Sequence, residues 1–151
     1  MHCNPLSRQR GGSAWALRSG LRMVSALVPG PINAEVTLTL AGGDRIVAVV
    51  TQGSVRDLGL AVGGRAFAIV KAPWVIVTTG DGGPRFSARN QLRGTVSAVK
   101  PGAVNAEVAI TLPGGALVHA VITQDAVSEL GLAPGVPASA VIKASHVVLG
   151  V

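Results

Sequence analysis

Aromatic residues are scarce in this sequence of 151 residues, which has no tyrosine, two phenylalanines and two tryptophans. Sequence-independent binding of single-stranded nucleic acid relies on stacking bases against aromatic side chains, and this chain offers few. Its one cysteine, Cys3, excludes an internal disulfide and gives no sign of an oxidising compartment. No apolar run approaches the ~20 residues of a membrane-spanning helix, and the stretch after Arg10 is too short for a secretory signal. We therefore expect a cytoplasmic protein without a membrane partner.

Charged residues are also few, at 13%, whereas hydrophobic residues reach 48%, as expected of a chain that buries a core. The net charge of +6 is unevenly distributed. Four arginines lie in the first 22 residues, where there is no acid, so nine basic residues face seven acidic ones in the remainder. Because that remainder is nearly neutral, the charge argues against nucleic acid as a partner.

The most prominent feature of the sequence is an internal repeat. Residues 24–36 align with 96–108, residues 51–52 with 123–124, and residues 69–72 with 141–144, always at an offset of 72 and without a gap. About half of the aligned positions are identical. The chain is therefore a tandem duplication.

Each copy has the pattern of a small all-β unit. In the first copy, apolar and β-branched stretches bounded by Pro-Gly or Gly-Gly predict strands at residues 21–28, 33–40, 45–51, 65–71 and 74–79, with a short helix at 54–60. This is the element order of an OB-like barrel. We predict an all-β fold of two tandem OB-like five-stranded barrels, each with one short helix.

The predicted organisation is a diverged or disordered leader at residues 1–20, a first domain at 21–79, a linker at 80–86 and a second domain at 87–151. A barrel of this size is marginally stable alone. Apolar strands such as residues 66–70 and 147–151 therefore predict burial against other copies, and hence a homo-oligomer. Two independent barrels on one chain are the alternative.

Catalysis has little support in the sequence. His2, His119 and His146 are scattered, and His146 stands where the first copy has Trp74, which favours a packing role. No Ser/His/Asp arrangement, carboxylate pair or Cys/His cluster is present. Glu35 and Glu107 recur, but Asn-Ala before each favours residues at the start of a strand. We expect no enzymatic activity.

Groups suited to binding an anion recur instead. Lys71 and Lys143 each end an apolar strand, where a lysine needs a partner or the rim of a site. Further candidates are hydroxyls at the helix start, small residues that expose backbone amides, and a Ser-Ala-Arg-Asn segment: Thr51, Ser54, Thr123, Ala72, Ala144, Ser145, Ser87, Ala88, Arg89 and Asn90. Together they match a tetrahedral dianion. The alternatives are that the lysines only extend to solvent and that Ser54 only caps its helix.

The sequence resembles the Mop (molbindin) domains, which are TOBE-like, and in tandem form the di-Mop molybdate-binding proteins. The resemblance rests on residues 87–94 (SARNQLRG), 102–108 (GAVNAEV) and 141–145 (VIKAS), with 33–36 and 70–74 in the first copy. It implies OB-like barrels assembled from three chains, and molybdate or tungstate bound at interfaces between units. It also implies a cytoplasmic store of the oxyanion, with no organic cofactor and no direct protein ligand to the metal.

The resemblance also implies two kinds of site. The first uses Ser87 and Arg89, facing a wall of Thr51, Ser54, Lys71 and Ala72, or of Thr123, Lys143, Ala144 and Ser145. The second, near the symmetry axis, is built around Gly102, Ala103, Val104, Asn105 and Ala106, with Ile32 and Asn33 in the first copy.

The first copy departs from this pattern. Trp15-Ala16-Leu17-Arg18 stands at the place of Ser87–Asn90, and a gap of two residues would align only Ser13-Ala14. In the second copy, Ala126 replaces the hydroxyl of Ser54. We predict that the anion-contacting arm of the first copy, the counterpart of Ser87–Asn90, is weakened or lost, and that fewer interface sites are therefore filled than in a symmetric di-Mop protein. An OB-type nucleic-acid-binding module and a molybdate sensor acting in trans are the alternative functions.

Overall fold

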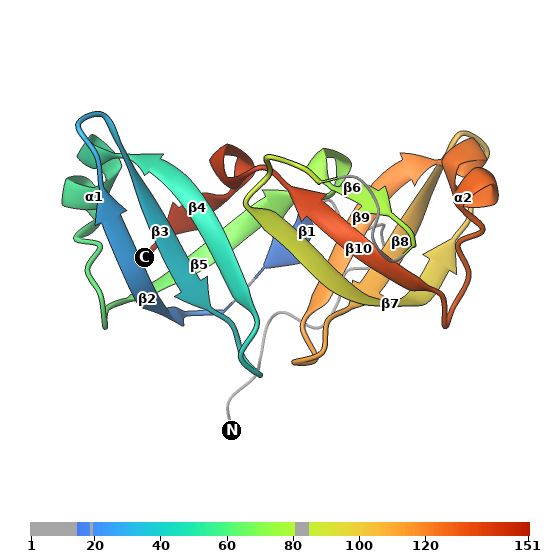
Figure 1. The fold of residues 1–151 in the computed structure, drawn as a ribbon, viewed down its shortest axis with the longest axis horizontal. Helices are drawn as coiled ribbons and strands as arrows, with labels where there is room; N and C mark the ends of the chain where they lie inside the picture. Colours follow the sequence, from blue (N-terminus) through green and yellow to red (C-terminus); the bar gives the residue numbers. More distant parts are fainter. Residues whose placement is uncertain (1–14, 19, 81–84) are drawn as a thin grey trace, which may run out of the picture.

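The computed structural model describes residues 15–18, 20–80 and 85–151. They form two sheets, which build two barrels side by side (Figure 1). Barrel one contains the sheet β1-β5-β2-β3-β4, with β11 added beside β5. Barrel two contains the sheet β6-β10-β7-β8-β9. The predicted all-β fold of two OB-like barrels is confirmed.

The first copy supplies β1 (Trp15–Arg18), β2 (Arg22–Pro29), β3 (Asn33–Thr39), β4 (Arg45–Thr51), α1 (Gln52–Leu58), β5 (Arg65–Lys71), the 3₁₀ turn η1 (Ala72–Trp74) and β6 (Ile76–Thr78). Alternation of side chains places Ala34, Val36 and Leu38 of β3 in the core, as the period of a half-buried strand requires. The helix begins earlier than predicted because the Thr51 hydroxyl caps it, accepting a hydrogen bond from the Ser54 N–H.

The second copy supplies β7 (Asn90–Lys100), β8 (Asn105–Thr111), β9 (Leu117–Thr123), α2 (Gln124–Leu130), β10 (Pro137–Ile142), η2 (Ala144–His146) and β11 (Val148–Gly150). Both helices end at a glycine in the left-handed conformation, Gly59 with φ 62° and Gly131 with φ 61°. This is the usual helix stop, because glycine adopts positive φ without steric cost. The two copies are therefore alike in local structure.

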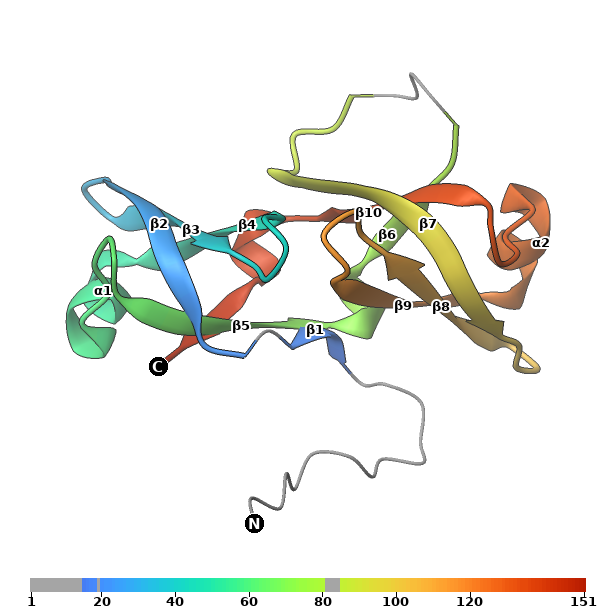
Figure 2. The same cartoon turned by 90° about the horizontal axis from the view of Figure 1, so that it is seen from below.

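The two copies exchange their last strands. β6 of the first copy pairs antiparallel with β10, with Val77 opposite Ala140, and so completes barrel two. β11 of the second copy pairs antiparallel with β5, with Leu149 opposite Ala68, and completes barrel one. Figure 2 shows the C-terminal strand beside β5. The repeat in the sequence is therefore not the unit in space, and neither barrel forms from one copy alone.

The end of the predicted leader is ordered. Residues Trp15–Arg18 form β1, which pairs with β5, and Ala16 and Leu17 are 0% and 4% exposed. The expectation of a disordered leader is therefore wrong for these four residues, because the apolar pair Ala16-Leu17 gains burial in the core. Residues 1–14 and 19, which include Ser13-Ala14, and residues 81–84 of the linker lie outside the described residues.

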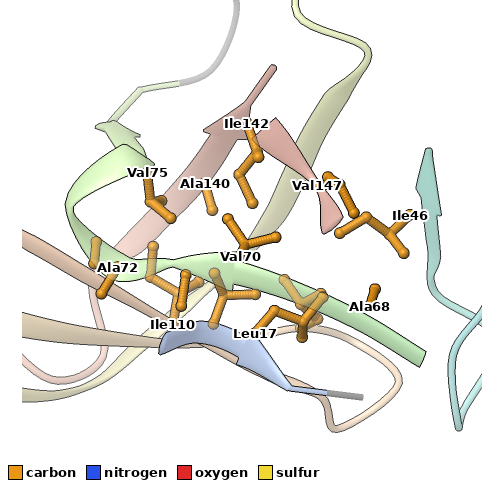
Figure 3. Close-up of a cluster of buried hydrophobic side chains, with 14 of the residues drawn as sticks. Leu17, Ile46, Ala68, Val70, Ala72, Val75, Ile110, Ala140, Ile142 and Val147 are labelled. Carbon is orange, nitrogen blue, oxygen red and sulfur yellow. The ribbon is translucent and has the colours of Figure 1, made fainter. Parts of the chain in front are cut away.

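One core runs through both barrels. Val70 of β5, Ile142 of β10 and Val147 after η2 are all at most 3% exposed and belong to the same cluster. Figure 3 shows these side chains meeting others from both copies. The alternative of two independent barrels is therefore wrong. Much of the apolar surface of residues 66–70 and 147–151, which we expected to need another chain, is covered by the other copy.

A clasp joins the edge of barrel one to barrel two. The side chain of Asn90, which is 2% exposed, accepts a hydrogen bond from the Val47 N–H (2.7 Å) and donates one to the Val47 carbonyl (2.8 Å). These are backbone groups of β4, the last strand in the sheet order of barrel one. Nearby, the carboxylate of Asp44 accepts a hydrogen bond from the Gly114 N–H (3.0 Å). No helix among the described residues has the length and apolar character needed to cross a membrane.

Candidate functional site

The arm at residues 87–90 runs into β7 and is held from both ends. Asn90 fixes it to Val47, as described above. On the other side, the Gln91 amide donates hydrogen bonds to the carbonyls of Phe86 (3.1 Å) and Ala88 (3.2 Å). These contacts set the direction of the arm and leave Ser87 and Arg89 exposed.

Arg89 forms a two-pronged ion pair with Glu35 on β3. Its Nε and Nη2 donate to the two carboxylate oxygens at 3.1 and 2.8 Å. The hydrogen bonds from Arg89 hold the pKa of Glu35 below its ordinary value of 4.5; burial of the carboxylate opposes them, and the charge of Arg89 adds to them. The pair raises the pKa of Arg89 for the same reason. Because the Arg89 side chain is 58% exposed, its other N–H groups remain available to a second anion.

Three of the predicted site residues meet at one cavity. Ser87, Ala88 and Lys143 line a cavity of about 260 Å³ beside the end of β10. Lys143 stands at the start of η2, so Ala144 and Ser145 follow it directly, and Ser145 is exposed. The remaining lining residues are mainly apolar or aromatic: Trp74, Ile76, Phe86, Val141 and His146. The described lining therefore offers an ammonium and a hydroxyl but no carboxylate.

Trp74 reaches this cavity because of the strand exchange. It belongs to η1, which precedes β6 and so lies against barrel two. Its ring contacts that of His146, with centroids 5.0 Å apart, and the Lys71 ammonium lies 5.0 Å from the centre of the Trp74 ring. His146 has the packing contact that its equivalence to Trp74 predicts, and it also lines the cavity.

The threonines and Ser54 lie elsewhere. Thr51 caps α1, and Thr123 caps α2 by accepting from the Ala126 N–H. Figure 1 places α1 and α2 at the two outer ends of the molecule and the 3₁₀ turns η1 and η2 between the barrels. Lys71 directly precedes η1, and Lys143 directly precedes η2. Within one chain, therefore, the structure does not bring Thr51 and Ser54 to Lys71, or Thr123 to Lys143. Each threonine instead lies beside the turn predicted for the axial site, since Thr51 pairs with Asn33 and Thr123 with Asn105.

The two axial-site turns have the same construction. In each, the helix's first N–H donates to a turn carbonyl, from Gln52 to Ile32 (3.0 Å) and from Gln124 to Val104 (2.8 Å). A Cβ on Gly30 would lie 2.7 Å from the Asn33 carbonyl oxygen, and one on Gly102 would meet that of Asn105. Glycine is therefore required at both turns. The tips are apolar and open, because Ile32 is 76% and Val104 73% exposed, with Ala103 also exposed and Ala106 buried.

A family model for the TOBE domain matches the chain twice, at residues 23–77 and 87–149. The chain belongs to the TOBE-domain family. Its relatives include MopA of Rhodobacter capsulatus, a molybdenum-pterin-binding protein, which is 44% identical over 126 residues, or 83% of this chain and 48% of MopA. ModE of Herbaspirillum seropedicae, a molybdenum transport protein, is 44% identical over 129 residues, or 85% of this chain and 48% of ModE. This TOBE chain thus spans about half the length of these curated relatives.

Among solved structures, the cytoplasmic molybdate-binding protein ModG with molybdate bound matches the fold with a TM-score of 0.82 and 55% identity. The match covers 87% of this TOBE chain and 93% of the ModG chain.

The TOBE repeat in barrel one lacks the arm. In β1, Trp15 pairs with Lys71 and Leu17 pairs with Val70. Val70 corresponds to Ile142 of barrel two, which pairs with Asn90. Leu17 therefore occupies the strand position that Asn90 has in barrel two. The register shifts between Trp15 and Leu17, so the chain reaches the same strand position with an extra residue. Leucine has no polar group with which to clasp a neighbouring edge strand, so the repeats are locally unequal.

Sequence reasoning missed the role of Glu35 and the burial of Asn90. Their signals were the recurrence of an acid at residues 35 and 107 and the loss of asparagine from the first TOBE repeat. In barrel two the carboxylate of the equivalent acid, Glu107, lies 3.2 Å from Nδ1 of His119.

Proposed function

We propose that this protein binds molybdate or tungstate as an oxyanion and stores or buffers it in the cytoplasm, without catalysis. The cavity that joins Ser87 to Lys143 is the observation that carries the proposal. A tetrahedral dianion accepts hydrogen bonds from hydroxyl, ammonium and guanidinium groups, and charged partners strengthen them. The absence of a carboxylate from the described lining suits an anion, and the molybdate-binding relative ModG has the same fold.

Within this proposal, some residues of the arm contact the oxyanion and others position the arm. Ser87 and Arg89 contact the oxyanion from the exposed side of the arm, and Lys143, Ala144 and Ser145 contact it from η2. Asn90 positions the arm instead of contacting the anion, because both ends of its amide bind Val47. Glu35 holds the Arg89 guanidinium in place through its two hydrogen bonds.

Assembly into a homotrimer completes the sites. Apolar side chains are exposed at matching places in both copies: Ile32 and Val104 are 76% and 73% exposed, and Ile76 and Val148 are 57% and 54% exposed. A soluble protein gains free energy by covering such residues. In a trimer, the open turns around Ile32 and Val104 would meet near the axis and form the second kind of site. The threonines beside them, Thr51 and Thr123, would reach an anion there or in a neighbouring chain.

The two copies contribute unequally. Barrel one has Trp15 opposite Lys71, and Pro73 at the place of Ser145, so both the guanidinium and a hydroxyl are missing. The Lys71 ammonium lies over the Trp74 ring instead. We therefore propose one working interface site per chain, built from the second arm.

The relatives do not favour the nucleic-acid alternative. Their names include a molybdenum transport protein and a transcriptional regulator as well as molybdenum-pterin-binding proteins. A sensor acting in trans would use the same oxyanion site, so storage and sensing share the binding test below.

Titration calorimetry with molybdate tests the proposal directly. We expect saturable binding by the wild-type protein and a loss of about tenfold or more in affinity for Arg89→Ala, since a charge-assisted hydrogen bond is removed. The matched control is Arg56→Ala, an exposed arginine on α1, which should leave affinity unchanged. Absence of molybdate binding by the wild-type protein would refute the function, whereas unchanged affinity in Arg89→Ala would refute only the role of Arg89.

A further inference from the structure

A row of polar side chains crosses three strands of barrel two on the face away from the core. Strand β10 lies between β6 and β7 (Figure 2), and in their register Ser139 is paired with Thr78 on one side and with Arg93 on the other. Ala138 and Ala140 on either side of Ser139 are 5% and 0% exposed, so Ser139 points to the outer face. Neighbouring strands lie about 5 Å apart, which brings two hydroxyls and a guanidinium within reach of one small ligand.

The row lies in a second cavity of about 260 Å³, distinct from the one beside Lys143. Its lining adds the hydroxyl of Thr79 and the backbone of Gly80 to Thr78, Ser139 and Arg93. The other lining residues are small or apolar: Gly94, Val136, Pro137 and Ala138. None of these lining residues is acidic, and Arg93 makes no ion pair with any described residue.

Barrel one lacks this arrangement. At the place of Ser139 it has Phe67, which pairs with Gly150 at the place of Thr78. A Cβ on Gly150 would meet the Phe67 ring, so that ring lies over the glycine and occupies the outer face. Leu21 stands at the place of Arg93 and is 52% exposed. The fold itself therefore does not require a polar row, and the cavity of barrel two is a property of its own residues.

We propose that this cavity, which we call the outer-face site, binds a second tetrahedral oxyanion, such as phosphate, sulfate or molybdate. Arg93 supplies two parallel N–H donors to two oxygens of the anion, a geometry that guanidinium groups favour. The hydroxyls of Thr78, Thr79 and Ser139 donate to the remaining oxygens. The outer-face site is open to solvent and has one cationic side chain, Arg93. It therefore binds an anion more weakly and with less selectivity than the site formed by the arm at residues 87–90 and Lys143. It does not depend on the function proposed above.

The test follows backbone amide resonances of the full-length protein while inorganic phosphate is added at constant ionic strength. We expect saturable shifts at Thr78, Thr79, Gly80 and Ser139 at millimolar phosphate. Arg93→Ala should weaken this binding by about tenfold or more, because a charge-assisted pair of hydrogen bonds is lost. Arg93→Lys should give an intermediate affinity, because the charge stays and the two-pronged geometry is lost.

Arg56→Ala serves again as the control for total charge, and it should bind phosphate as the wild type does. Repeating the titration with molybdate distinguishes a general oxyanion site from one specific for phosphate. Shifts at the same amides with both anions support the proposed class. The proposal is overturned if these amides fail to shift while those of Ala88 and Lys143 respond, if neither anion shifts them, or if Arg93→Ala retains wild-type affinity.

Discussion

The Asn90 clasp should be among the most costly polar interactions to remove. Asn90 is 2% exposed, and it satisfies both the N–H and the carbonyl of Val47, at 2.7 and 2.8 Å. Asn90→Leu introduces the residue that the first copy has at this strand position, Leu17, and leaves both Val47 groups without these partners. Two lost hydrogen bonds, with partial desolvation of the groups left behind, predict destabilisation by about 2–4 kcal/mol.

Urea denaturation at one fixed protein concentration measures this effect, because stability of an oligomer depends on concentration. A control is Ser25→Ala, which removes an exposed hydrogen bond of 3.3 Å to the Thr37 carbonyl and should change stability by less than about 0.5 kcal/mol. Asn90→Asp adds a second test. Its carboxylate would face the Val47 carbonyl, so its pKa would rise on folding, and the loss of stability should be smallest at acidic pH, where the protonated acid donates again. A stability of Asn90→Leu equal to that of the Ser25 control would refute the clasp.

Three further changes test other parts of the account. Leu17→Ala removes a buried side chain of β1, which is 4% exposed, and should cost about 2 kcal/mol or more in urea denaturation; no change would show that β1 is not part of the core. Gly94→Ala should cost about 1–3 kcal/mol, because the new Cβ would meet the Thr111 carbonyl and lie 2.8 Å from Ile110 Cγ2, and wild-type stability would contradict this packing. Hydrogen bonds with Arg89 lower the pKa of Glu35 below 4.5 in the folded protein, so the ion pair stabilises the fold above that pH, and this stabilisation is lost as the pH falls through the lowered pKa. Glu35→Gln should therefore lose less stability than the wild type on acidification. Parallel profiles of stability against pH for the two proteins would refute this role of the pair.

The strands and helices could be predicted from the sequence because they depend on local patterns. The alternation in residues 33–39 and the Gly-Gly turns determine strands that form in either copy. The exchange of β6 and β11 could not be predicted in this way. Their sequences, IVT and VLG, have similar patterns and similar buried centres, so nothing local selects the sheet to which each is added. The first strand was missed because Trp15–Arg18 has lost the motif that marks its equivalent.

The candidate site, too, could be predicted only in part from the sequence. The arm and the lysine after β10 could be found from the sequence, and the structure brings Ser87 and Lys143 to one cavity. The sequence did not predict that α1, which Thr51 caps, and η1, which follows Lys71, lie at different ends of barrel one, because motif residues carry no information on distance. It also did not separate a polar residue that contacts a ligand from one that holds the backbone. Asn90 looked like a ligand contact, and burial assigns it to the clasp.

Equilibrium dialysis of the purified protein against molybdate, with its mass and molybdenum content measured together, tests the central claim most directly. Lys143→Ala removes the ammonium that lines the cavity with Ser87, and Lys71→Ala is its matched control, since the Lys71 ammonium lies over Trp74. We predict that the wild-type protein binds molybdate as a trimer, that Lys143→Ala loses one molybdate per chain, and that Lys71→Ala loses none. A wild-type protein without molybdate, or equal losses in the two lysine variants, would contradict it.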